Sequence, residues 1–201
     1  MENQAPQENN KNLNLKTYLE KGISYTQYRG EMKKEIDINR DGDMSAYIKI
    51  NEQRMNRLDK KAILSEEIIK SIESLENKKY WLVLTEHWCG DAAQIVPVLA
   101  KIANESNGKI ELKLIYRDEN LELMDQFLTN NGRSIPKLIQ LDQNHIIEND
   151  WGPRPKIAQE MVMALRANPE TAASYSEHLH KWYAQNKQVN IQEELLKIIL
   201  E

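Results

Sequence analysis

The segment that most constrains this chain is Thr85–Ala92 (Thr-Glu-His-Trp-Cys-Gly-Asp-Ala), which joins a strand pattern to a helix pattern and carries the only cysteine. The apolar run 80–84 before it is typical of a buried strand, and apolar residues at helical spacing after it predict a helix to about residue 105. First-turn amides of a helix carry partial positive charge, so a thiol placed there favours its thiolate. The sequence therefore predicts a reactive cysteine, Cys89, at a strand-to-helix junction.

The surrounding apolar patterns predict the order of elements. A helix over 66–76 is expected, with Ser65 as its N-cap. The expected strands are, in chain order, 80–84, 109–116, 136–141 and 145–151. Further helices are expected from an N-cap at Asp118 to about 128, and from Pro155 at the first helical position to about 165.

The connections fix how these strands pair. The first two must be parallel because a helical crossover joins them, whereas the last two are linked by residues 142–144 alone and should form an antiparallel hairpin. We therefore predict an α/β domain with a mixed central sheet of about four strands and helices on both faces.

This region resembles the thioredoxin fold. Thioredoxins carry Trp-Cys-Gly-Pro-Cys at a strand-to-helix junction and a helix-kinking proline five residues after the second cysteine. This chain has Trp88, Cys89, Gly90, Asp91 and Ala92 in that register; Pro97 matches the kinking proline.

Two later points extend the resemblance, which covers roughly residues 65–167. Ile135 and Pro136 look like the Ile-Pro of thioredoxins, whose cis proline faces the active cysteine. Trp151-Gly152 falls where the family has a glycine after its last strand. The alternative for Pro136 is a trans proline at a strand start.

Two of the positions at which the chain departs from the thioredoxin pattern bear directly on the thiol chemistry. Ala92 stands where the second cysteine resolves the mixed disulfide, so this chain alone should not act as a dithiol reductase. Val83 stands where thioredoxins have a buried acid that assists proton transfer. One thiolate can still attack a disulfide or be oxidised, with an external thiol completing the reaction.

Several residues are candidates for tuning the thiol or lining its groove. Asp91 suits the helix terminus, yet its charge opposes thiolate formation, whereas a protonated His87 would favour it. We expect Trp88 and Trp151 to flank the groove, with plain packing as the alternative. For Cys89 we expect a partly exposed, reactive thiol; the alternative is a small, buried, unreactive residue. The remaining members of the predicted site are Gly90, Ala92 and Ile135.

Other segments lie outside the resemblance. We divide the chain into a disordered tail (1–12), an N-terminal helical extension (13–64), the thioredoxin-like domain (65–167) and a C-terminal helical extension (168–201). In the N-terminal extension we expect a helix that extends across Gly22 and another over 44–58. We expect the appended helices to pack against the domain or against a second copy of the chain.

Residues 37–44 resemble the first half of an EF-hand calcium loop. The bidentate carboxylate that should close such a loop is replaced by Ile48, so a turn capped by Asp41 or Asp43 is the preferred interpretation. His87, Cys89 and Asp91 are too close in sequence to converge on one metal ion. We expect neither a metal nor another cofactor.

Composition restricts the partners. A net charge of −4 without a dense basic stripe argues against nucleic acid, and no apolar run approaches the ~18–20 residues of a membrane span. One cysteine cannot form an internal disulfide, which fits a reducing compartment, so we expect a cytoplasmic protein.

The leading hypothesis is a monothiol redox protein, a thiol-disulfide oxidoreductase in which Cys89 is the nucleophile and Pro136 shapes the groove. Its partners would be protein or low-molecular-weight thiols and disulfides. The alternative is a non-catalytic binding module that kept the fold.

Overall fold

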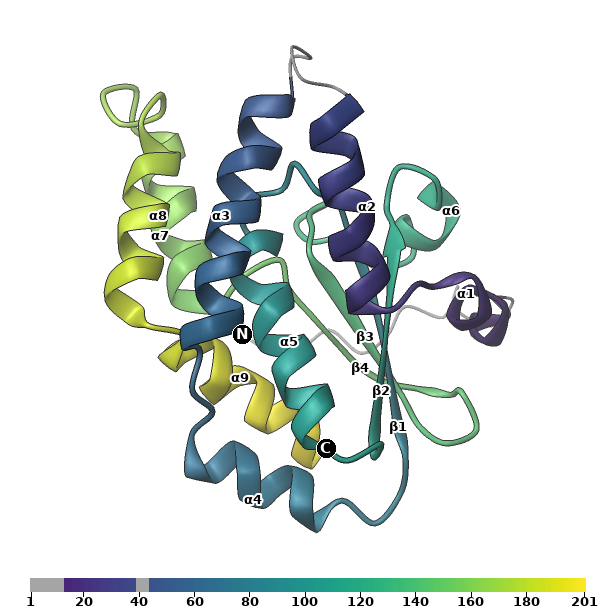
Figure 1. Cartoon of the computed structure of the whole chain (residues 1–201). Helices are drawn as coiled ribbons and strands as arrows, with labels where there is room; N and C mark the ends of the chain where they lie inside the picture. The colour runs from purple at the N-terminus through teal and green to yellow at the C-terminus, as the bar shows by residue number, and fades with distance from the viewer. Residues whose placement is uncertain (1–12, 39–43) are drawn as a thin grey trace.

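A four-stranded mixed sheet forms the centre of the molecule (Figure 1). The computed structural model describes residues 13–38 and 44–201; the predicted tail and most of the EF-hand-like loop fall outside this part. The strands are β1 (Lys79–Thr85), β2 (Ile110–Tyr116), β3 (Lys137–Leu141) and β4 (Ile147–Trp151). Their order is β2-β1-β3-β4, with β1 parallel to β2 and antiparallel to β3, and β3 antiparallel to β4. The predicted mixed sheet and hairpin are confirmed.

The helices before and between the strands follow from local signals. They are α1 (Leu15–Lys21), α2 (Tyr25–Ile38), α3 (Ser45–Lys61), α4 (Glu66–Ser74), α5 (Ala92–Glu105) and α6 (Leu121–Met124). Ser65 is the predicted N-cap of α4: its hydroxyl accepts the Ile68 N–H at 3.3 Å. α6 is shorter than predicted, and its N-cap position is Asn120 rather than Asp118.

The N-terminal extension contains a break that the sequence pattern did not predict. The expected helix across Gly22 divides into α1 and α2, because Ile23 leaves the helix to pair with Leu114 of β2 through two 2.8 Å backbone hydrogen bonds. A Cβ at Gly22 would lie 2.8 Å from the Lys113 Cβ, so the close approach to the strand favours glycine. α1 and α2 therefore belong to the edge of the sheet.

The C-terminal helices are α7 (Lys156–Ala167), α8 (Tyr175–Asn186) and α9 (Val189–Leu200). α7 begins one residue later than predicted, so Pro155 is its N-cap rather than its first helical residue. α8 packs on α7, and α9 packs on α4 and β4, as Figure 1 shows. The apolar stripe of α9 is buried within the chain itself, through Ile191, Leu195, Ile198 and Ile199.

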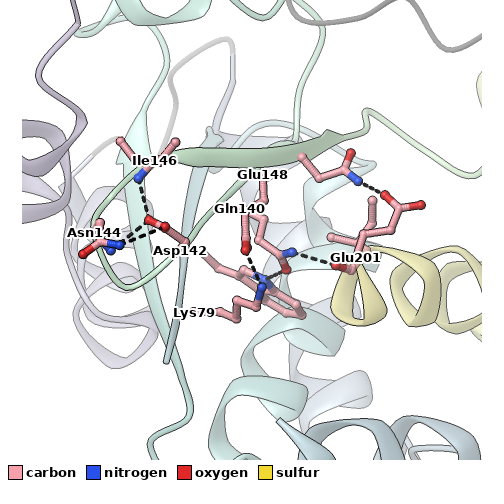
Figure 2. Close-up of polar contacts among 10 residues, drawn as sticks. Lys79, Gln140, Asp142, Asn144, Ile146, Glu148 and Glu201 are labelled. Carbon is pink, nitrogen blue, oxygen red and sulfur yellow. Dashed lines mark hydrogen bonds and ion pairs between the residues drawn. The ribbon is translucent and has the colours of Figure 1, made fainter. Parts of the chain in front are cut away.

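A buried glutamine ties α9 to the middle of the sheet (Figure 2). Gln140 of β3 is fully buried; its carbonyl accepts the Trp81 indole N–H at 2.9 Å, and its amide donates to the Ile198 carbonyl at 2.7 Å. Nearby, Asn149 donates to the Glu201 carboxylate, and Lys79 pairs with Glu148 at 2.5 Å. Because buried polar groups need partners, this network fixes where the last helix docks.

Within the described residues, no helix is both long and apolar enough to cross a bilayer.

Candidate functional site

Cys89 lies in the turn between β1 and α5, as the sequence predicted. Its Sγ accepts the Ala92 N–H at 3.4 Å and donates to the Ile135 carbonyl at 3.3 Å. The residue is 7% exposed. The expectation of a partly exposed thiol is therefore wrong: the turn is enclosed by the segment before Pro136 and by side chains of the C-terminal extension.

Burial and charge act together on this thiol. Burial raises the pKa of Cys89 to about 12, and the negative charge of Asp91 contributes to the rise. The backbone N–H groups of Ala92 and Asp91 lower the pKa, as does the positive charge of Arg154. The helix terminus therefore opposes desolvation without overcoming it, and the resting sulfur is a thiol.

The segment opposite the sulfur is built by Pro136 and Gly152. The Ile135–Pro136 and Gly152–Pro153 peptide bonds are both cis. Gly152 has a φ of 121°, and a Cβ there would lie 2.2 Å from the Pro136 carbonyl oxygen. Only glycine satisfies both the positive φ and the close approach, so Gly152 sets how near β4 comes to the start of β3.

Asp91 forms a buried cluster with two residues that sequence reasoning missed. Arg154 binds its carboxylate through Nη2 at 2.5 Å and Nε at 3.2 Å, and the Tyr183 hydroxyl donates to it at 2.6 Å. The Asp91 and Arg154 side chains are 9% and 14% exposed. We call these three residues the Asp91 clamp. Nothing local in the sequence pairs residues 63 and 92 positions apart, although a buried carboxylate requires partners.

Gly90 lies beneath α8. A Cβ at this position would lie 2.9 Å from the His180 ring and 3.5 Å from the Arg54 guanidinium. The His180 Nδ1 is buried without a hydrogen-bond partner among the described residues, and burial lowers the pKa of His180 to about 4. Helices α3 and α8 thus close over the Cys89–Asp91 turn.

His87 points away from this cluster, toward the N-terminal extension. Its Nδ1 lies 2.6 Å from the Glu35 carboxylate, and its Nε2 lies 3.1 Å from the Tyr28 carbonyl and 3.2 Å from the Tyr116 hydroxyl. Its polar contacts therefore go to α2 and β2 rather than to the thiol.

The two tryptophans lie in different surroundings. Trp88 lies under the Arg117 guanidinium, 4.9 Å from the ring centre, and lines an open cleft of about 430 Å³. Trp151 is buried, and its indole N–H donates to Glu194 of α9 at 2.7 Å. Ala92, which stands where thioredoxins have their second cysteine, is buried at the start of α5.

The cleft beside Trp88 is lined by five carboxylates and one lysine, Lys34. Its carboxylates are Glu31, Glu35, Glu86, Asp118 and Glu119. Burial raises the pKa of Glu86 to about 7, although the Asp118 N–H that it accepts lowers the value. A larger cleft of about 590 Å³, between α2, α3, α5 and β2, contains none of the predicted site residues. Among the described residues, no three His, Cys, Asp or Glu side chains gather as a metal ion requires.

Comparisons with known proteins agree with this geometry. A family model described as thioredoxin matches residues 38–175. A thioredoxin from Haemophilus influenzae is 33% identical over 69 residues, a match that spans 34% of this chain and 62% of that protein. This chain therefore covers less than two thirds of that relative.

Two crystal structures share the fold. One, a protein of unknown function from Pseudomonas aeruginosa, superposes with a TM-score of 0.60 at 17% identity, covering 90% of this chain and 94% of the other. An HIV epitope-scaffold gives the same score and identity over 92% and 96%.

Proposed function

We propose, since this chain belongs to the thioredoxin family, that it is a monothiol redox protein which forms mixed disulfides through Cys89. The arrangement around the sulfur carries this proposal: the Ala92 amide of the α5 terminus points at Sγ, and the carbonyl before Pro136 faces it at 3.3 Å. Backbone donors at a helix terminus stabilise the thiolate that such chemistry requires.

The reaction has two exchanges. The Cys89 thiol first releases its proton to solvent. The resulting thiolate attacks one sulfur of a substrate disulfide, the S–S bond breaks, and the departing thiolate takes up a proton while Cys89 remains in a mixed disulfide. A second, external thiolate then attacks the substrate sulfur of that mixed disulfide and releases Cys89. The substrate disulfide is the oxidant, and the external thiol is the reductant. Because Ala92 offers no sulfur, both reagents come from outside the chain.

We take the reagents to be protein or low-molecular-weight disulfides and thiols in the cytoplasm. The lone cysteine supports this location, because thiols stay reduced there.

A second candidate, a non-catalytic binding module, is favoured by the burial of the thiol and its pKa of about 12. At pH 7 a thiol with so high a pKa is almost entirely protonated, so exchange at the resting site would be slow.

Mixed-disulfide formation separates the two candidates. Native protein is incubated with glutathione disulfide at pH 8, and intact-mass spectrometry follows the adduct; Cys89→Ser is the control for labelling elsewhere. A redox protein gives one adduct on the native chain, which dithiothreitol reverses. Labelling that occurs only after unfolding in urea would contradict the redox proposal and favour the binding module.

A further inference from the structure

In the Asp91 clamp, a buried carboxylate lies two residues after the reacting cysteine and accepts hydrogen bonds from Arg154 and Tyr183. Both carboxylate oxygens accept from Arg154, and one also accepts from Tyr183. Tyr183 belongs to α8, and Arg154 to the loop between β4 and α7. Asp91, two residues after Cys89, is thus held by parts of the chain that follow the sheet.

We propose that Arg154 and Tyr183 are positioning residues of the Cys89 site: through Asp91 they hold the thiol-bearing turn and offset the carboxylate charge beside the sulfur. This inference rests on the proposed function in treating Cys89 as the reacting group. The acidity of the thiol can nevertheless be measured whether or not the protein exchanges disulfides, so the two can fail separately.

The geometry gives each residue a direction of effect. Arg154 meets the carboxylate with two donors, so its guanidinium is fixed beside the same charge that opposes the thiolate. The Asp91 charge raises the pKa of Cys89, and the Arg154 charge lowers it. Replacing Arg154 by a neutral residue should therefore raise the pKa of Cys89, because the Asp91 charge is no longer offset by the arginine. Replacing Asp91 by asparagine should lower that pKa, because the Arg154 charge remains.

Other titratable and charged groups near the turn come from several elements. They are Tyr28 of α2, Arg54 of α3, Glu86 immediately after β1, and His180 of α8. The tyrosine pKa values are raised well above 10 for Tyr28 and Tyr183, and that of His180 is lowered to about 4. Glu86, with a pKa of about 7, is mostly ionised above pH 8, so over the pH range of the test the growing thiolate fraction of Cys89 governs the rate.

The test is the rate of Cys89 alkylation by iodoacetamide between pH 8 and 10. This neutral reagent is not attracted by the arginine, and the chain has one cysteine. Below the pKa the rate follows the thiolate fraction, partly offset by nucleophilicity, so each pKa unit changes it by about threefold. We expect Arg154→Gln to react about three- to tenfold more slowly than native protein.

Each of the other variants should change the alkylation rate in a stated direction. Asp91→Asn should react about three- to tenfold faster, and the Asp91→Asn, Arg154→Gln double variant should fall between the two single variants. Tyr183→Phe should be slower by about twofold because one donor to the carboxylate is lost. Arg154→Lys, which keeps the charge, should recover part of the rate. Arg166→Gln on α7 is the matched surface control.

The direction of the change in alkylation rate distinguishes a positioning role from a general loosening of the turn. A variant that only loosens the turn would expose the sulfur and react faster, whichever member of the clamp is changed. Equal rates for Arg154→Gln and native protein, faster reaction of Arg154→Gln, or no rescue by Arg154→Lys would overturn the proposal. If Arg154→Gln fails to fold, as unfolding curves would reveal, the double variant removes both buried charges, and its rate against Asp91→Asn supplies the same comparison.

Discussion

Among single residues, two glycines differ in whether their positions could accept a larger residue. Gly152 has a φ of 121°, and a Cβ added there would lie 2.2 Å from the Pro136 carbonyl oxygen, whereas a Cβ at Gly30 of α2 would meet nothing within 4 Å. We expect Gly152→Ala to lower the free energy of unfolding by about 2–4 kcal/mol. Gly30→Ala, in a helix interior, should raise it by about 1 kcal/mol.

Urea denaturation of both variants tests this contrast. The midpoint should fall for Gly152→Ala and rise for Gly30→Ala, with the slope of the transition unchanged. A Gly152→Ala protein as stable as the native chain would mean that β4 can move away from Pro136 at little cost.

Glu86 gives a pH-dependent prediction at the same scale. Its folded-state pKa of about 7 exceeds the ordinary value of 4.5, so the folded state favours the protonated acid. The stability that this preference contributes is present below pH 4.5 and is lost as the pH rises toward 7. Glu86→Gln should keep the hydrogen bond from the Asp118 N–H and escape this loss.

The measurement is the free energy of unfolding of native protein and Glu86→Gln at pH 4.5 and pH 8. The variant should gain relative to native protein by about 1 kcal/mol between these pH values, after allowance for solvent screening. A constant difference across the range would place the titration of Glu86 at its ordinary value.

For the secondary-structure elements, the docking of α9 on the sheet depends on the buried Gln140. Gln140→Leu would leave the Trp81 indole N–H and the Ile198 carbonyl without their partners. Since each buried unpaired group costs about 1–3 kcal/mol, we expect a loss of about 2–4 kcal/mol in unfolding free energy. Asn149→Ala removes an exposed contact to the same helix and should change stability by less than about 0.5 kcal/mol. Thermal unfolding of the two variants should therefore separate clearly, and similar values would show that α9 docks through apolar packing alone.

The elements themselves were largely predictable, because each is set by local periodicity and capping. The strands, their parallel and antiparallel pairing and the Ser65 cap all follow from local patterns and short connections. Errors occurred where a distant part of the chain intervenes: Ile23 breaks a helix by pairing with Leu114. The position of Cys89 was predictable from its junction, but its burial was not, since the enclosing side chains lie far along the sequence.

For the whole molecule, the C-terminal extension is structurally part of the domain. α9 buries its apolar stripe, Gln192 accepts the Ser65 N–H at 2.8 Å and donates to the Ile63 carbonyl at 3.0 Å, and Glu194 accepts from Trp151 and from the Lys156 N–H. These contacts join α9 to the segments before α4 and α7. The extension therefore stabilises the sheet and both helix starts together.

Removal of residues 188–201 should consequently abolish cooperative unfolding. We expect the shortened chain to show no sharp thermal transition by near-ultraviolet circular dichroism, because the core would lose four buried apolar side chains and Gln140 a partner. Leu200→Ala, at an exposed position of α9, is the control and should melt like native protein. A cooperative transition in the shortened chain would instead show that the domain folds without α9.

The pairing of Ile23 with Leu114 has a consequence for how copies of this protein behave toward one another. β2 is an edge strand, and an uncovered edge offers its N–H and C=O groups to any strand of another molecule. The short bridge at Ile23 occupies those groups at Leu114 and anchors α1 and α2 along the edge. The opposite edge, β4, carries the charged residues Glu148 and Asp150, which form ion pairs with Lys79 and Lys137, and charged side chains on an edge strand disfavour the addition of another strand. Both edge strands of the sheet, β2 and β4, thus have features that oppose the edge-to-edge association that leads to aggregation.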